Sequence, residues 1–309
     1  MERLNRSERI LAILITLAFL FWLYKSEGFI HPDSLFQVLE QAHHQAYGLG
    51  VQAWEQRIGA RPMLPKLMLA PLLLIWDKTI GYNPLAIKSF LDVATMLASL
   101  ATTYTAYLWA GRLYGREAGQ IAAALTGFSG VLFLWGTRFN MDVYASLCMA
   151  SAYMLYARES NVKAPLASGL LTGFAIALMY RIGVLAIPLT LFYARFHRKK
   201  LKPYLAGLAV PTAIIGLGDL LVYGMPFHSI ISFFSKNVVD DWSSAFTTQH
   251  PLFYLLFYVL HLPALYLLVY SFKADEKSLP FIALAFYTLV FSFIGHKQVR
   301  YMIPVIPFL

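Results

Sequence analysis

Charged residues and cysteine are both scarce in this 309-residue chain. Charged residues make up 13% of it and hydrophobic residues 59%, and Cys148 is the single cysteine. No intrachain disulfide is therefore possible, and cysteine usage does not report the redox compartment. Low-complexity tracts, internal repeats and a polar domain at either end are also missing from the sequence. Together with a mean hydropathy of +0.59, this excludes an ordinary water-soluble enzyme and indicates an integral membrane protein.

The positive charge of the chain does not indicate nucleic-acid binding. The formal net charge is +9, but no RNA- or DNA-reading motif is present, and lysine and arginine lie mostly at the ends of apolar runs. At such places cations set membrane topology. We therefore expect an all-α multi-pass membrane protein forming a single transmembrane domain over residues 1–309, with room for about ten spans.

The first apolar run follows a basic N-terminus. Residues 1–9 carry three arginines, and the run from Ile10 to Tyr24 is not followed by a small-x-small cleavage site. These features are typical of a retained signal anchor whose N-terminus is cytoplasmic.

A short apolar segment decides the rest of the topology. Leu67 to Trp76 is only ten residues long and contains Pro71, so it is too short to cross the bilayer and is expected to be a re-entrant or interfacial helix. Counting it as a span would put the basic cluster of residues 195–202 outside, against the positive-inside rule. The expected later spans are 85–109, 118–135, 143–156, 165–179, 184–194, 204–223, 252–270 and 279–294.

The longest polar interval, residues 29–66, lies in a predicted external loop over residues 27–80. Asp33 precedes an amphipathic helical pattern, in which Ser34 and Gln37 have the spacing of a capping box and Gly48 marks the end. We expect this helix to lie at the membrane surface, with Asp33 just outside its N-terminus beside backbone donors. A carboxylate in that position is the best candidate for chemistry.

The same topology brings other ionisable residues to the external face. They lie in the turn 136–142, in the loop 225–250, at the tip 296–300 and at Arg181. Charged groups at a membrane are costly and mark functional sites by default. One carboxylate with several cations suits sugar transfer from a polyprenyl phosphate, with the carboxylate as general base and the cations on the leaving phosphate. A single base is enough for an inverting displacement.

Three motifs resemble a known family. The first loop contains His31-Pro32-Asp33, then Gly48 and Gly50, Trp54-Glu55 and Arg61. Later come Gly218-Asp219-Leu-Leu-Val-Tyr223-Gly224 with Phe233-Phe-Ser-Lys-Asn237, and His296-Lys297-Gln298-Val-Arg300-Tyr301. In this order they are similar to motifs of the dolichyl-phosphate-mannose-dependent mannosyltransferases of glycosyltransferase family 22, such as the GPI third-mannose and lipid-linked oligosaccharide enzymes. Ser34 and Gln298 stand where that family has glutamate.

The resemblance implies a GT-C-type helical bundle, Asp33 as general base, and a polyprenyl (dolichyl) phosphate sugar donor. The acceptor would be a lipid-linked glycan, membrane lipids would be partners, and no nucleic acid, cofactor or divalent metal is expected. The implied phosphate ligands are Lys297, Arg300, His296, Arg61 and Arg181. The residues implied to contact or shape the acceptor are His31, Trp54, Glu55, Arg138, Asp142, Asp219, Tyr223 and Asn237.

Most of these residues also have an ordinary structural interpretation. Asp33 could cap the surface helix, Asp219 could bond a neighbouring helix, and Lys297 and Arg300 could extend to lipid headgroups. Buried charges also mark transport paths, so a transporter or lipid-linked glycan flippase is the alternative function, and an inactive scaffold of a glycosylation complex is a weaker one. The compact loops favour a prokaryotic cell membrane over the ER membrane. The end of the chain inside an apolar segment, residues 303–309, suggests truncation.

Overall fold

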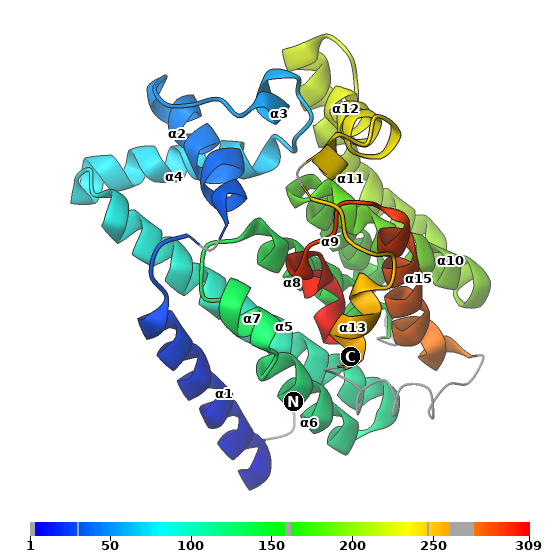
Figure 1. The fold of residues 1–309 in the computed structure, drawn as a ribbon. Helices are drawn as coiled ribbons and strands as arrows, with labels where there is room; N and C mark the ends of the chain where they lie inside the picture. The colour runs from blue at the N-terminus through cyan, green and yellow to red at the C-terminus, as the bar shows by residue number, and fades with distance from the viewer. Residues whose placement is uncertain (1–3, 30, 158–161, 246, 260–274) are drawn as a thin grey trace.

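The computed structural model describes residues 4–29, 31–157, 162–245, 247–259 and 275–309. All regular structure in these ranges is helical (Figure 1). Four described segments have the length and hydropathy to cross a membrane, namely α1 (Arg6–Lys25), α5 (Pro84–Tyr114), α11 (Arg198–Tyr223) and Glu276–Phe293, which contains α15 (Leu279–Phe293). The predicted all-α membrane fold is therefore confirmed.

Helix α1 is attached to the bundle by one buried carboxylate. Its N-terminus has a capping box in which Asn5 and Glu8 exchange side-chain and backbone hydrogen bonds. The Glu8 side chain also accepts hydrogen bonds from Tyr107 of α5 (2.8 Å) and from Arg116 of α6, the helix Arg116–Gly127 (Nε, 2.6 Å). Glu8 is only 4% exposed, so this ion pair fixes α1 against α5 and α6 at one end of the molecule.

The core of the bundle is built from shorter helices packed closely together. They are α7 (Gly130–Trp135), α8 (Met141–Tyr156), α9 (Lys163–Leu178) and α10 (Ala186–Phe196), with a 3₁₀ turn, η2 (Tyr180–Leu185), between the last two. Helices α9 and α11 come so close that a Cβ on Gly169 would lie 1.9 Å from the Tyr204 carbonyl oxygen. Small residues at such crossings let helix backbones approach, as is usual in membrane bundles.

Two predicted spans differ from the structure. The segment 118–135, which we expected to span the membrane, is not one continuous helix, because α6 ends at Gly127 and α7 starts at Gly130 after a break at Phe128 and Ser129. Gly127 faces the Ile15 side chain of α1, where a Cβ would lie 2.6 Å away, so this close contact coincides with the break. The expected span over 252–270 begins as α13 (Phe253–Val259), and its remainder lies outside the described residues.

One end of the molecule carries the short helices of the polar segments. Figure 1 shows α2 (Glu40–Tyr47), α3 (Trp54–Arg57), α4 (Leu64–Ile80) and α12 (His228–Phe234) gathered there, with α4 lying across the end of α5. Two further short segments, η3 (Ser235–Val239) and η4 (Trp242–Ala245), follow α12. Helix α4 is not one of the four span candidates, in keeping with the interfacial helix expected around Pro71.

The last segment returns into the middle of the bundle. After η5 (Glu276–Ser278) and α15, the 3₁₀ helix η6 (Val299–Phe308) is buried along most of its length. Its Phe308 packs edge-on against Trp109 of α5 and Tyr153 of α8, with ring centroids 5.1 and 4.7 Å away. This packing anchors η6, and Arg300 near its start contacts Asp33 in the segment that follows α1.

Candidate active site

Asp33 lies in the first turn of the helix that follows α1. The helix begins at Pro32 and Asp33 and continues as a π-helical stretch, η1 (Ser34–Leu39), before α2. Wide helical turns of this kind are rare and are found frequently at functional sites. The expected end of the helix is confirmed, because Gly48 is left-handed (φ 71°) and its N–H donates to the His44 carbonyl at 2.8 Å.

The predicted capping box is wrong. No side-chain capping bond is present at the start of η1, and Asp33 is inside the helix rather than just before it. The Gln37 side chain does not turn back to the helix N-terminus but donates to Glu55 Oε1 at 2.8 Å. A charged acceptor in the facing segment competes with the local cap, because hydrogen bonds to charged groups are the stronger ones.

The Asp33 carboxylate is held by groups from both ends of the chain. Its Oδ2 accepts a hydrogen bond from the Arg300 guanidinium and forms an ion pair with it, while His31 Nδ1 lies 3.5 Å from Oδ1. Burial raises the pKa of the Asp33 carboxyl, but His31 and the positive charge of Arg300 outweigh burial and hold the pKa below its usual range. Asp33 is therefore an ionised carboxylate at neutral pH.

Arg300 is positioned by a chain of polar groups beneath it. The Gln298 Oε1 accepts from Arg300 Nε, and the Gln298 amide nitrogen lies 3.0 Å from His296 Nε2. On the other side of the ring, His296 Nδ1 is 3.0 Å from the Thr247 carbonyl oxygen. Since a carbonyl oxygen only accepts, Nδ1 carries the proton and Nε2 accepts from Gln298. Burial lowers the pKa of His296, which keeps this ring neutral at pH 7.

A second ion pair lies next to the first. Arg181 forms an ion pair with Asp142. The Cζ atom of Arg181 lies 4.3 Å from the ring centroid of Tyr301, and the Cζ atom of Arg300 lies 5.7 Å from the same centroid. Asn140 Oδ1 accepts from the Asp142 N–H at 2.8 Å. Three buried atoms here, Asn140 Nδ2, Asp142 Oδ2 and Arg181 Nε, have no hydrogen-bond partner among the described residues. Buried polar atoms are seldom left unpaired, so these are available to a ligand.

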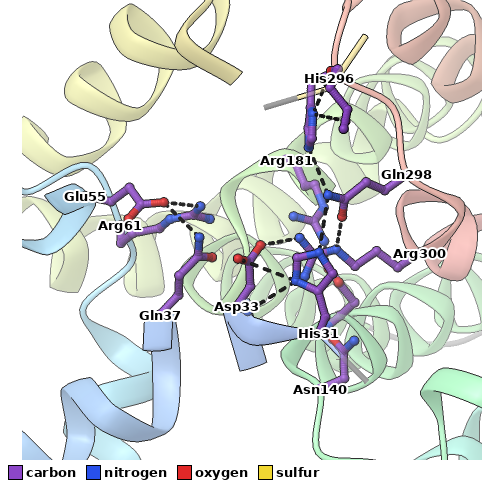
Figure 2. A network of polar contacts seen from close by, with 12 residues as sticks. His31, Asp33, Gln37, Glu55, Arg61, Asn140, Arg181, His296, Gln298 and Arg300 are labelled. Carbon is purple, nitrogen blue, oxygen red and sulfur yellow. Dashed lines mark hydrogen bonds and ion pairs between the residues drawn. The ribbon is translucent and has the colours of Figure 1, made fainter. Parts of the chain in front are cut away.

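A third cluster lies across Asp33 from Arg300. Figure 2 shows Glu55, Arg61 and Gln37 on one side of Asp33 and Arg300, Gln298 and His31 on the other. Arg61 pairs with Glu55 at 3.1 Å and lies over the Phe233 ring, 5.9 Å from its centroid. Arg61 Nε is buried without a hydrogen-bond partner in the described part of the chain. The carboxylate thus lies between two guanidinium groups.

Sequence reasoning missed Lys66, at the start of α4. Its Nζ lies 3.5 Å from Gln56 Oε1, and it forms no ion pair with any described residue. Burial lowers its pKa. The sequence signal was a cation at the start of α4, in the stretch Arg-Pro-Met-Leu-Pro-Lys. The first motif that resembles the family ends before this lysine.

Lys297 is not brought to Asp33. It is 4% exposed, and its Nζ donates to the carbonyl oxygens of Gln249 (3.1 Å) and Ile294. The tip is extended at Gln298 (φ −139°, ψ 145°), so alternate side chains point in opposite directions. His296, Gln298 and Arg300 therefore face the Asp33 side and Lys297 faces away.

Five other predicted residues make local contacts instead. Arg138 donates to the Leu134 carbonyl one turn back, and Asn237 to that of Phe233. Asp219 accepts from the Ser229 backbone and hydroxyl, as the helix-bonding interpretation predicted. The remaining two residues pack against other rings. The ring centroids of Tyr223 and His228 are 4.6 Å apart, and those of Trp54 and Trp242 are 5.1 Å apart. In the described residues no three His, Cys, Asp or Glu side chains gather as a metal site would need, and metal independence stays a prediction.

Comparison with known sequences agrees with the motifs. A family model described as the Alg9-like mannosyltransferase family matches residues 11–309. The chain is 25% identical over 298 residues to GPI mannosyltransferase 3 of Yarrowia lipolytica, covering 92% of this chain and 57% of that protein. It is 24% identical over 314 residues to GPI mannosyltransferase 3 of Candida albicans, covering 96% and 62%. The chain thus spans about three fifths of the length of these curated relatives.

A solved structure has the same fold. ArnT from Cupriavidus metallidurans bound to undecaprenyl phosphate superposes with a TM-score of 0.67 at 14% sequence identity, over 97% of this chain and 57% of that one. The GT-C-type architecture expected from the sequence is confirmed by this likeness.

Proposed function

Because the chain belongs to the Alg9-like mannosyltransferase family, we propose that it transfers a mannose from a polyprenyl phosphate to a lipid-linked glycan at the external membrane face, with inversion. The observation that carries the proposal is the contact between Asp33 and Arg300, which places one ionised carboxylate against a buried cation. We also assign residues 27–80, which contain Asp33, as the catalytic loop of a single transmembrane domain.

Asp33 is the general base of the proposed reaction. An acceptor hydroxyl attacks the anomeric carbon of the donor sugar, the new glycosidic bond forms as the bond to the phosphate oxygen breaks, and the hydroxyl proton passes to the Asp33 carboxylate. The side chain is a quarter exposed, so a hydroxyl can reach it. His31, against Oδ1, orients the carboxylate.

Cations on both sides of Asp33 hold the leaving phosphate. Negative charge grows on the phosphate as the glycosidic bond breaks, and fixed guanidinium donors stabilise it. Arg300, Arg61 and Lys66 are the candidates, because Lys297 is occupied by backbone carbonyls. That ArnT was crystallised with undecaprenyl phosphate supports a polyprenyl phosphate donor.

Donor binding and base activation are linked through Arg300. Arg300 is bound to the Asp33 carboxylate, and the singly charged phosphodiester of the donor competes for it. When Arg300 turns to the phosphate, Asp33 loses its cation and becomes a stronger base while burial persists. The base is thus activated when the donor is in place.

The other carboxylates near the site are unsuited to act as nucleophiles. Glu55 is bound to Arg61, and Asp142 to Arg181, and both are buried. A retaining double displacement needs a second carboxylate next to the sugar. The lone accessible carboxylate therefore favours inversion.

The same geometry suits either of two membranes. The compact loops favoured a prokaryotic cell membrane. The two yeast relatives outweigh this and favour the ER membrane, with the site facing the lumen. In both cases we propose that α1 starts in the cytoplasm and Asp33 lies on the opposite side.

The test uses the full chain in membranes with labelled polyprenyl-phosphate mannose and a lipid-linked glycan acceptor. A new glycosidic product with inverted configuration is expected. Relocation of the label across the membrane without a new bond would instead indicate a transporter or flippase. If neither a product nor relocation is observed, the chain is a scaffold.

A further inference from the structure

A cavity of about 250 Å³ lies behind the helix that carries Asp33. Its walls come from α2, from the end of α4 and from the start of α5. On the η1 stretch, Leu35 and Leu39 face this cavity, whereas Gln37 reaches toward Glu55 and the site. The cavity and the site are thus separated by one helix and share none of the site residues described above.

Three rings form one wall of the cavity. His43 and Tyr47 have centroids 4.8 Å apart, and each lies 6.3 Å from Tyr82, with the two tyrosine rings perpendicular. The Tyr82 hydroxyl is 3.4 Å from His43 Nε2, which ties the turn before α5 to α2. Aromatic rings that turn their faces to a shared space attract an ammonium group through the negative charge of those faces.

Two carboxylates border the same rings. Glu40 and Asp77 both line the cavity, and neither forms an ion pair with a residue in the described ranges. Glu40 accepts from the Val51 N–H at 2.9 Å with Oε1. Burial, followed by the charge of Asp77, raises the pKa of the Tyr47 hydroxyl. The negative charge therefore lies against the aromatic wall and is not neutralised by the protein.

Groups suited to an anion lie elsewhere on the lining. Lys88 Nζ pairs with Asp92 and lies 5.5 Å from the Phe29 ring centroid. The Trp76 indole nitrogen is buried and has no hydrogen-bond partner among the described residues. An indole N–H can only donate, so an acceptor oxygen of a ligand would satisfy it.

We propose that this cavity binds the zwitterionic headgroup of a membrane phospholipid, with its ammonium among His43, Tyr47 and Tyr82 beside Asp77, and its phosphate at Trp76 and Lys88. The location specifies the source of the headgroup. The cavity lies at the start of the long span α5, and apolar side chains around it are open to the surroundings, with Leu85 76% and Ile80 63% exposed. Such a rim at the interface suits acyl chains that continue into the bilayer.

The bound headgroup would stabilise the helix that presents Asp33. Leu35, Leu39 and Glu40 belong to the continuous η1–α2 helix, whose first turn contains Asp33. A lipid held behind this helix fixes it against α4 and α5 without touching the reacting groups. The role is therefore binding and positioning, and it does not depend on the proposed transferase activity.

Native mass spectrometry of the purified full chain tests the site. The probes are phosphatidylethanolamine and phosphatidylglycerol with identical acyl chains, titrated in the same detergent. The wild type is expected to bind the zwitterionic lipid about tenfold more tightly, since only that lipid has an ammonium group for the aromatic wall and Asp77. Asp77→Asn should remove this preference, and Asp77→Lys should reverse it toward the anionic lipid.

Tyr82→Leu provides a second test without a change of charge. Tyr82 is 65% exposed, so the variant keeps the fold, and it should lower affinity for the zwitterionic lipid while leaving that for the anionic lipid unchanged. The matched control is Glu117→Gln, an exposed acid in the first turn of α6, which should change neither affinity. Equal binding of both lipids by the wild type, or an unchanged preference in Asp77→Asn and Tyr82→Leu, would overturn the assignment. So would displacement of the phospholipid by a lipid-linked glycan, which would make the cavity part of the acceptor site.

Discussion

Replacing Arg300 with glutamine separates the two tasks assigned to this guanidinium. Arg300 is 6% exposed and contacts both Asp33 and Gln298, so it is held next to the proposed base. Removing one fixed donor that faces developing charge lowers turnover by about 10²–10³, or roughly 3–4 kcal/mol. Arg300→Lys keeps the charge but loses the planar fork, so an intermediate loss is expected.

The same substitution changes the pH dependence in a defined direction. In the wild type the pKa of Asp33 is held below its usual range, so the base stays ionised and kcat/KM has no acid limb from it above about pH 5. Without Arg300 burial remains as the largest influence, the pKa of Asp33 rises, and the carboxylate becomes protonated earlier as pH falls. An acid limb should then enter the profile.

Initial rates of glycoside formation with labelled donor, measured from about pH 5 to pH 8 on purified protein, provide the assay. The control is Arg198→Gln, an exposed arginine at the start of α11, for which rates and profile should match the wild type. Melting temperatures show whether the loss reflects unfolding. Wild-type rates, or a reduced rate with an unchanged pH profile, would refute the reasoning that Arg300 both binds phosphate and acts on Asp33.

Three further predictions concern packing, pairing and donor affinity. Gly169→Ala should destabilise the fold by about 1–3 kcal/mol, because the added Cβ would meet the Tyr204 carbonyl oxygen. Thermal melting measures this loss, and an unchanged melting temperature would contradict the close crossing of α9 and α11. Asp142→Ala leaves Arg181 buried and unpaired and should cost about 3–5 kcal/mol, whereas a double variant that removes both charges should recover part of the loss in the same measurement. Donor titration should show that Asp33→Asn binds the polyprenyl phosphate at least as tightly as the wild type, since Asp33 and the phosphate compete for Arg300. A large loss of affinity would instead mean that Asp33 helps to bind the donor.

The sequence was informative about topology and about which segments meet. Apolar run lengths and the distribution of cations are properties of whole segments. From them we predicted that the first loop, the 136–142 turn, Arg181 and the 296–300 tip lie together, and the Asp33–Arg300 and Asp142–Arg181 ion pairs show that they do. Arg300 reaches Asp33 from 267 residues away, as that topology required. The short α4 with its internal proline was likewise readable from length alone.

Individual contacts were much less predictable. Whether Gln37 caps its own helix or bonds Glu55 depends on a facing segment that periodicity does not reveal. Lys297 and Arg300 looked equivalent as cations, but the extended backbone of the tip sends them in opposite directions. Lys66 was overlooked because a lone cation beside an apolar helix usually marks only a membrane boundary.

The single-turnover transfer rate of Asp33→Asn shows most directly whether Asp33 removes the acceptor proton. With donor prebound and excess acceptor, we expect a rate about 10³-fold below the wild type, the middle of the range for a lost general base, with folding and donor binding intact. Transfer within about tenfold of the wild-type rate, with the donor equally bound, would contradict the account and leave the Asp33–Arg300 pair a structural contact only.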